Sequence, residues 1–118
     1  MWKFNARPES EDYDPDKLAY YFFQALAVVN YLHERNVYHG AIRPAAFEIF
    51  SNQRVKTSDF NFALRLNPSF PDTQESYQLK HLPYFCKDEV ARKFNSGGKF
   101  SKRELVEIDR HALLKTFE

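Results

Sequence analysis

The part of this chain that decides its fold is residues 31–61, YLHERNVYHGAIRPAAFEIFSNQRVKTSDFN. It begins with the last turn of an apolar helix, which Asn36 can end because asparagine tolerates the left-handed conformation. A short apolar piece at 37–39 leads into a loop that contains Pro44. Within 47–57, two runs rich in β-branched and aromatic residues flank a polar turn. The stretch therefore predicts the end of a helix, a loop and a small β-hairpin in succession.

The sequence before this stretch predicts a long helix from 15 to 35. Asp14 can cap its N-terminus with a carboxylate, and Pro15 supplies a preset φ for the first helical position. Apolar residues then recur at steps of four and three, the spacing of one helix face: Leu18, Phe22, Ala25, Val29 and Leu32. Further apolar residues widen this face: Tyr21, Phe23, Leu26 and Val28. A helix that is apolar over most of its circumference is predicted to be central and buried.

The remaining sequence shows less regular structure. Residues 67–76 and 95–102 are rich in turn formers and predict loops. A second apolar helix is predicted at 105–117. Residues 1–14 carry charge without an apolar period, so we expect an extended lead-in. The rest, 15–118, is expected to form one domain with a single core, because this length suits one compact unit.

Charge and hydropathy argue against two classes of partner. Seventeen basic and sixteen acidic residues give a formal charge of +1, so no global field would attract nucleic acid or an anionic membrane. No apolar run approaches the roughly 20 residues that span a bilayer, and the N-terminus lacks the apolar core of a signal peptide. One group of basic residues predicts a solvated loop rather than a phosphate-binding patch: Arg92, Lys93, Lys99, Lys102 and Arg103.

The single cysteine, Cys86, cannot form an internal disulfide. No Cys/His spacing typical of a zinc site is present, so the sequence predicts no bound metal. A lone thiol is typical of a reducing compartment. We therefore expect a cytoplasmic protein, either free or associated with a cytoskeletal or other large assembly.

Four short motifs follow one another along the chain. They are HGAIRPAA at 39–46, DFN at 59–61, HLPYFCKDEV at 81–90 and EID at 107–109. In this order and spacing they resemble the catalytic loop, the metal-binding motif, the end of the activation loop and the start of the central buried helix of a eukaryotic protein kinase. In the third motif, Lys87-Asp88 replaces the family's usual Ala-Pro. The resemblance covers about residues 15–118.

The resemblance implies an α+β, mainly α fold: a partial C-terminal kinase lobe with a small β-hairpin at the catalytic loop and no N-terminal lobe. It also implies that catalysis has been lost. Ala41 stands at the position of the catalytic base and cannot accept a proton. Ala46 stands at the position of the metal-binding Asn and offers no oxygen to magnesium. No N-lobe lysine or glycine-rich phosphate loop is recognisable, so we expect no nucleotide cofactor, no metal and no catalytic residue.

Four polar residues remain at this degenerate site. Asp59 matches the family's metal-binding Asp; we favour a structural carboxylate that accepts backbone N–H groups over a metal ligand. Arg43 has lost its expected partner at Ala41, and we favour a surface or partner-facing salt bridge over phosphate binding. Asn61 replaces the motif's glycine, and asparagine tolerates a left-handed backbone there. His39 is expected to be a packed, hydrogen-bonded core histidine rather than an acid or base.

The C-terminal motifs carry further expectations. By resemblance, Asp109 is a buried acceptor that braces the backbone of the catalytic loop. His111 is expected to be a packed core histidine. Glu89 is expected to be a buried carboxylate whose arginine partner lies beyond these residues. Because the covering helices of the family are not recognisable here, we expect an exposed apolar patch that includes some of Tyr21, Phe23, Leu26, Leu113, Leu114 and Phe117.

The sequence thus favours a catalytically inactive kinase-like module, a pseudokinase, that binds or supports a protein partner covering its apolar helix faces. One alternative is a fragment of a serine/threonine kinase or nucleotide-binding domain that an N-lobe located elsewhere completes. Ala41 and Ala46 argue against that alternative even if an N-lobe is supplied. A purely structural subunit of a large assembly is the third hypothesis. Neither nucleic acid nor membrane is an expected partner.

Overall fold

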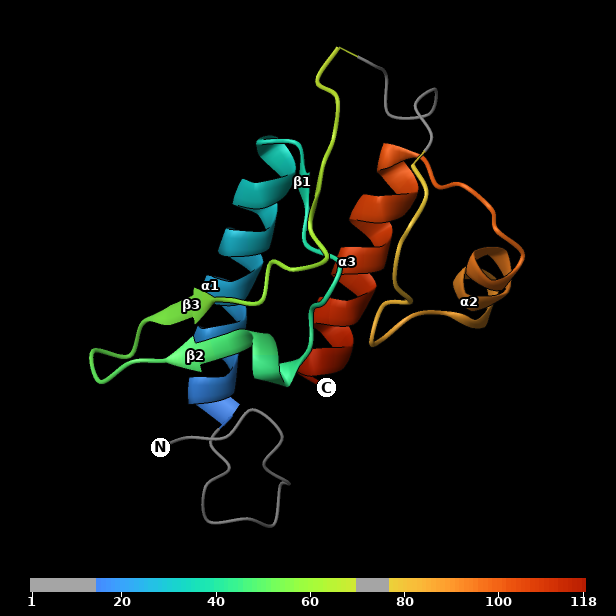
Figure 1. Cartoon of the computed structure of the whole chain (residues 1–118). Coiled ribbons are helices and arrows are strands. Elements are labelled where there is room, and N and C mark those ends of the chain that lie inside the picture. The colour runs from blue at the N-terminus through green and yellow to red at the C-terminus, as the bar shows by residue number, and fades with distance from the viewer. Residues whose placement is uncertain (1–14, 70–76) are drawn as a thin grey trace.

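The structure, a computed structural model, describes residues 15–69 and 77–118. These residues form an α+β fold with three α-helices and two small antiparallel sheets (Figure 1). In chain order the elements are α1 (Pro15–Glu34), β1 (Val37–Tyr38), the 3-10 turn η1 (Pro44–Ala46), β2 (Phe47–Ile49), β3 (Val55–Thr57), β4 (Leu64–Arg65), α2 (Asp88–Asn95) and α3 (Lys102–Thr116). The expected lead-in at 1–14, the Asp14 cap and part of the loop predicted at 67–76 lie outside the described residues.

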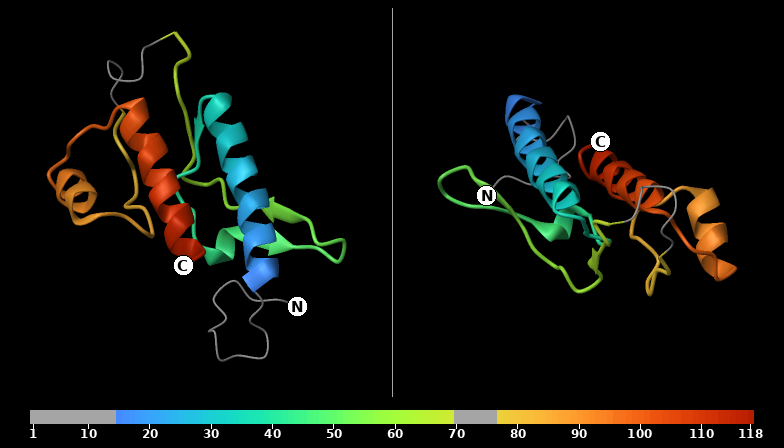
Figure 2. Two further views of the ribbon diagram at one scale, coloured as in Figure 1. Left: turned by 180° about the vertical axis from the view of Figure 1, so that it is seen from behind. Right: turned by 90° about the horizontal axis from the view of Figure 1, so that it is seen from above.

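Two helices form the back of the molecule. α1 and α3 lie side by side and run in opposite directions, with the β2–β3 hairpin packed against α1 and β1 in contact with both helices (Figures 1 and 2). One core cluster fills the space between α1, η1, the hairpin and the end of α3: Tyr21, Ala25, Val29, Ile42, Ala46, Phe47, Val55, Ala112, Leu113 and Phe117. Phe117 closes this cluster, because its ring lies 5.4 Å from Phe22 and 6.0 Å from Phe47, both in edge-to-face geometry.

A second core cluster lies beside the first half of α3. It joins β1 and the residue after β4 to the residues on either side of α2 and to the first half of α3: Tyr38, Leu66, Leu79, Phe100, Leu105 and Ile108. An isolated bridge pairs Tyr77, which precedes α2, with Phe100, which follows it. One face of α3 therefore contributes to both clusters, the first half of the helix to the second cluster and the last turns to the first.

The predicted helix at 15–35 is confirmed as α1, and Asn36 follows it with the expected left-handed φ of 60°. The prediction that α1 is buried over most of its circumference is wrong. Only one line of the helix is buried, whereas Tyr20, Phe23 and Tyr31 are 48%, 66% and 54% exposed. Apolar composition had suggested full burial, but the described core covers one face only.

The expected apolar patch also differs in its members. Tyr21, Leu113 and Phe117 are buried in the first core cluster rather than exposed. Phe23 and Leu114 do belong to the exposed surface, and Leu114 is 59% exposed. The patch expected at α1 and α3 is therefore smaller than the sequence indicated, because the two helices bury these three side chains against each other and the hairpin.

The predicted hairpin is confirmed. β2 and β3 pair antiparallel, with Ile49 opposite Val55. Gln24 of α1 fixes the hairpin, since its Oε1 accepts from Val55 N at 3.0 Å and its Nε2 donates to Gln53 O at 2.8 Å. The pairing of β1 with β4 was not predicted, because two strands of two residues each, far apart in sequence, leave no local signal.

The C-terminal third contains more helix than the sequence predicted. α3 begins at Lys102 rather than at residue 105, because Ser101 and Glu104 form a capping box that apolar spacing does not reveal. α2 was missed, since it has only eight residues and its apolar face, Val90, Ala91 and Phe94, spans little more than one turn. The predicted solvated loop of basic residues is correspondingly wrong: Arg92 and Lys93 belong to α2, and Lys102 is buried in the first turn of α3.

Among the described helices, none combines the length and the apolar character needed to cross a membrane.

Candidate functional site

One buried carboxylate of α3 binds the backbone of the 39–46 loop. Asp109 is 1% exposed, and it accepts backbone N–H groups from His39 at 2.9 Å and from Gly40 at 3.1 Å. His33 of α1 places its Nε2 2.9 Å from the same carboxylate. The prediction that Asp109 is a buried acceptor for this backbone is confirmed. Asp109 thus joins α1, α3 and the loop at one point.

His39 is held in the loop from both ring nitrogens. It is fully buried, and its Nδ1 accepts the backbone N–H of Ala41 at 3.1 Å. Its Nε2 lies 2.9 Å from the carbonyl oxygen of Ser58, and because Nδ1 accepts, Nε2 carries the proton and donates. The ring of Phe60 lies 4.9 Å away. His39 is the packed, hydrogen-bonded histidine that the sequence predicted.

The two alanines at the degenerate positions, Ala41 and Ala46, are packed into the protein. Ala41 is 4% exposed, and Ala46 is fully buried in the first core cluster. The backbone of Ala46 is used structurally, since its carbonyl accepts from Ser58 N at 2.8 Å and its N–H donates to Arg43 O at 2.9 Å. Neither methyl group can accept a proton or bind a metal. This part of the loop contributes shape rather than reactive groups.

Asp59 and Arg43 form an ion pair at the surface of the loop. Arg43 Nη2 lies 3.0 Å from Asp59 Oδ2, and the side chains are 38% and 23% exposed. Asn61 Nδ2 donates to the other carboxylate oxygen at 3.3 Å. The expectation that Asp59 accepts backbone N–H groups is therefore wrong, because side-chain donors occupy both oxygens and a charged guanidinium is the stronger donor.

The same contact corrects two expectations about the neighbouring residues. Arg43 has not lost its partner, because Asp59 replaces the one expected at Ala41, and its salt bridge lies within the chain. The left-handed residue of the motif is Asp59 itself, with φ of 63°, and Asn61 does not have positive φ. Arg43 also lies over the ring of Tyr84 at 5.7 Å. Its guanidinium is thus fixed between a carboxylate and an aromatic ring.

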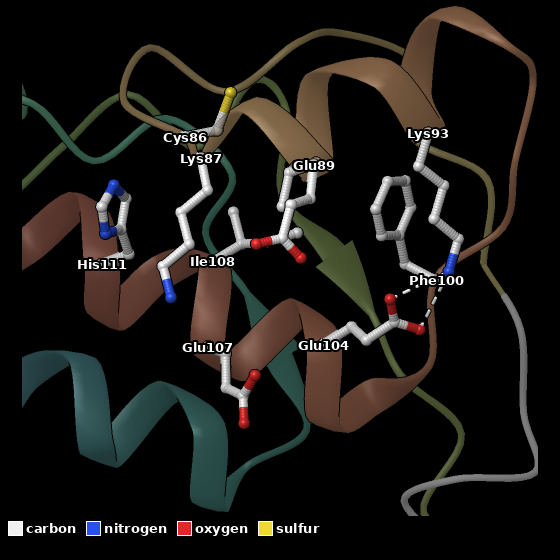
Figure 3. Close-up of a pocket in the computed structure, with 10 residues that line it drawn as sticks. Cys86, Lys87, Glu89, Lys93, Phe100, Glu104, Glu107, Ile108 and His111 are labelled. Carbon is white, nitrogen blue, oxygen red and sulfur yellow. Dashed lines mark hydrogen bonds and ion pairs between the residues drawn. The ribbon is translucent and has the colours of Figure 1, made fainter.

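A second candidate site is a cavity of about 240 Å³ between α2 and α3 (Figure 3). Val90, Phe100 and Ile108 provide its apolar surface. Polar side chains from both helices and from the residues just before α2 surround it: Cys86, Lys87, Glu89, Lys93, Glu104, Glu107 and His111. Sequence reasoning missed this cavity because one of its two walls, α2, was not predicted.

The cavity corrects two further expectations. Glu89 is exposed at its rim rather than buried, so it does not need a partner to offset desolvation. His111 is only half-buried, and it lines the cavity rather than the core. Burial lowers the pKa of His111, and the positive charges of Lys87 and Lys115 lower it further.

Two further groups that line the cavity, Glu104 and Cys86, have shifted pKa values. Burial alone would raise the pKa of Glu104, but hydrogen bonds from Lys93 and Ser101 outweigh it and hold that pKa below its usual value. Lys93 Nζ lies 2.9 Å from the Glu104 carboxylate. Burial, followed by the charge of Asp88, raises the pKa of the Cys86 thiol. Cys86 is therefore a weak nucleophile at neutral pH.

Within the described parts of the chain, no three His, Cys, Asp or Glu side chains are grouped so that they could hold a metal ion. No known protein-family model matches the chain. The kinase resemblance therefore depends on the four motifs and their order.

Proposed function

We propose that this chain is a catalytically inactive, kinase-like module that acts by binding a protein partner. The observation that carries the proposal is the construction of the 39–46 loop. Asp109 holds its backbone in place, yet the two positions that resemble the catalytic base and the metal-binding Asn are buried alanines. The loop keeps the hydrogen bonds to Asp109 that fix its backbone, but it lacks the base and the metal ligand. This combination suits a protein that uses the kinase-like fold for binding and not for phosphoryl transfer.

The Arg43–Asp59 ion pair supports the same proposal, but less strongly. Magnesium requires oxygen ligands in near-octahedral geometry, and Asp59 is the one carboxylate that the motif offers. A partly exposed ion pair contributes only about 0–1 kcal/mol, so a metal could displace Arg43 if further ligands were present. Ala46 supplies no second ligand. The lack of a ligand oxygen at Ala46 therefore argues against magnesium binding more strongly than the Arg43–Asp59 ion pair does.

The surface around the loop favours a protein as partner. Four large hydrophobic side chains are exposed on the segments that flank the loop: Phe60, Phe62, Leu82 and Tyr84 are 45%, 38%, 45% and 63% exposed. Aromatic surface of this kind is typical of protein interfaces. A cytoplasmic scaffold or a structural subunit of a larger assembly fits the proposal, and the balanced charge favours neither nucleic acid nor membrane as a partner.

A second candidate is a kinase or nucleotide-binding domain that an N-lobe located elsewhere completes. The observation that favours it is the retention of Asp59, whose carboxylate is still 23% exposed. This candidate requires that catalysis proceed without a base at Ala41 and with one metal ligand. Positioning and electrostatics supply nearly all the catalysis in phosphoryl transfer, so these losses should abolish it.

One experiment separates the two candidates. The tagged chain is recovered from its native source with bound partners, and transfer of labelled phosphate from ATP to peptide substrates is measured beside an Asp59→Ala variant recovered in the same way. The inactive module predicts equal, background incorporation in both samples. Incorporation that Asp59→Ala abolishes would overturn the proposal in favour of the completed kinase. The stoichiometry of the recovered complex distinguishes a regulatory partner from a structural subunit.

A further inference from the structure

Arg43 contacts two segments that lie far from it in the sequence. Its Nη2 donates to Asp59 Oδ2 at 3.0 Å, and its guanidinium carbon lies 5.7 Å from the centre of the Tyr84 ring. Asp59 belongs to residues 58–63, between β3 and β4, whereas Tyr84 belongs to residues 77–87, which precede α2. One guanidinium therefore joins the 39–46 loop to both segments.

The same two segments carry the exposed hydrophobic surface that is proposed to bind a partner. Phe60 and Phe62 lie on the first segment, and Leu82 and Tyr84 lie on the second. The segments also meet directly, because the rings of Phe62 and His81 lie 4.0 Å apart. Since two separate segments supply this surface, its shape depends on how they are arranged relative to each other.

We propose that Arg43 is a positioning residue that fixes this arrangement and thereby sets the affinity of the surface for its protein partner. The inference rests on the proposed function, because it takes the surface to be the binding face. Arg43 suits the role, since a guanidinium donates hydrogen bonds in its plane and stacks on aromatic rings with its face. Its side chain acts through the two segments and does not need to touch the partner.

The first segment requires support because it contains a left-handed residue. Asp59 has φ of 63°, a conformation that costs free energy for a residue other than glycine. Asn61 Nδ2 donates to one carboxylate oxygen at 3.3 Å, and Arg43 donates to the other, so two side chains stabilise this conformation. The next ring, that of Phe60, lies 4.9 Å from the buried ring of His39. The conformation of Asp59 thus determines where Phe60 is presented.

The second segment is held at Tyr84 from two directions. Arg43 lies over its ring, and the ring of Phe85 packs against it edge-to-face at 4.7 Å. Phe85 in turn packs against the first core cluster. Tyr84 therefore lies between the core and the Arg43–Asp59 ion pair, and most of its side chain stays exposed for a partner.

The strength of these contacts sets the size of the effect to expect. A partly exposed ion pair and a cation–π contact are each weak, and the Phe62–His81 and Tyr84–Phe85 contacts remain when Arg43 is replaced. Replacing Arg43 should therefore loosen the surface without unfolding the chain. Because a less ordered surface must pay more entropy on binding, we expect partner affinity to fall by about three- to tenfold.

Fluorine NMR of the chain labelled with 3-fluorotyrosine tests the positioning without a partner. The Tyr84 resonance, assigned by its loss in Tyr84→Phe, should shift in Arg43→Gln and narrow as the ring gains motion. The matched control is Arg35→Gln, because Arg35 lies 4.8 Å from the ring of Tyr31 on α1. It should change the Tyr31 resonance and leave that of Tyr84 unchanged. A Tyr84 resonance that Arg43→Gln does not alter would refute the positioning role.

The consequence for binding is tested with the protein that is recovered with the wild-type chain from its native source. Titrated with that protein, Arg43→Gln and Phe60→Ser should both bind more weakly than the wild-type chain. Arg54→Gln, which changes an exposed arginine in the turn of the β2–β3 hairpin, should bind as the wild type does. Arg43→Lys keeps a charge for Asp59 but has no planar group to lie over Tyr84, so it should recover only part of the affinity.

The results separate this inference from the proposed function. If Phe60→Ser weakens binding and Arg43→Gln does not, the positioning role is wrong and the inactive module stands. If neither variant weakens binding, the surface is not the binding face, and the positioning role fails with it. Phosphate transfer that Asp59→Ala abolishes would contradict the inactive module alone, because the Tyr84 resonance measures the effect of Arg43 independently.

Discussion

Replacing Asp109 with alanine removes the carboxylate that joins α1, α3 and the 39–46 loop. The backbone N–H groups of His39 and Gly40 lose their acceptor at a buried position, and the ring of His33 loses its partner. Each buried donor left without a partner costs about 1–3 kcal/mol. The two N–H groups alone would therefore cost about 2–6 kcal/mol, but removing a desolvated charge recovers part of this. We expect Asp109→Ala to lower the free energy of unfolding by about 3 kcal/mol.

Two variants make this test specific. Asp109→Asn keeps the side-chain volume and one acceptor oxygen, but its NH2 group would face one of the backbone N–H donors. Its loss of unfolding free energy should therefore lie between those of the other two variants. Asp59→Ala removes a carboxylate that is 23% exposed and paired with a half-exposed arginine, so it should cost no more than about 1 kcal/mol. Urea denaturation followed by circular dichroism measures all three. If Asp59→Ala costs as much as Asp109→Ala, the supporting role assigned to Asp109 is wrong.

Two further predictions concern the loop and the cavity. Gly40→Ala should cost about 2–4 kcal/mol, because at φ of +82° the added carbon would lie 2.8 Å from the Phe62 carbonyl oxygen. Gly97→Ala, at φ of +77° with no atom within 4 Å, should cost only about 1–2 kcal/mol, and urea denaturation of both variants checks the difference. The pKa of Glu104 is lower in the folded chain than its ordinary value of 4.5, so the ionised carboxylate stabilises the fold at pH values above 4.5. This contribution is lost as the pH falls through the folded pKa. Glu104→Gln should therefore reduce the loss of melting temperature between about pH 6 and pH 3, whereas an unchanged pH profile would contradict the assigned ion pair with Lys93.

The parts of the fold that could be predicted are those encoded by neighbouring residues. The spacing of apolar residues revealed α1, the left-handed Asn36 followed it, and two short runs around a polar turn revealed the β2–β3 hairpin. α2 was not found in this way, because its eight residues carry an apolar face of only Val90, Ala91 and Phe94, too short to show a helical period. The β1–β4 pair could not be found either, since contacts between distant short strands depend on the whole core.

The candidate site likewise contains features that the sequence predicts and features that depend on the folded backbone. Asp109 was assigned from its place in a motif, and its buried hydrogen bonds to His39 and Gly40 match that assignment. The ion pair between Arg43 and Asp59 was not predicted, because it depends on how a left-handed residue directs its side chain across the loop. Sequence order identifies which groups are present, whereas their pairing depends on backbone geometry.

Binding of ATP with magnesium tests the proposal of an inactive module most directly. A ligand present at 100 times its Kd stabilises the native state by about 2.7 kcal/mol, which a thermal melt detects readily. With millimolar ATP and magnesium, we predict no rise in the melting temperature of the chain, whether alone or with its recovered partners. A rise that requires magnesium and disappears in Asp59→Ala would contradict the proposal.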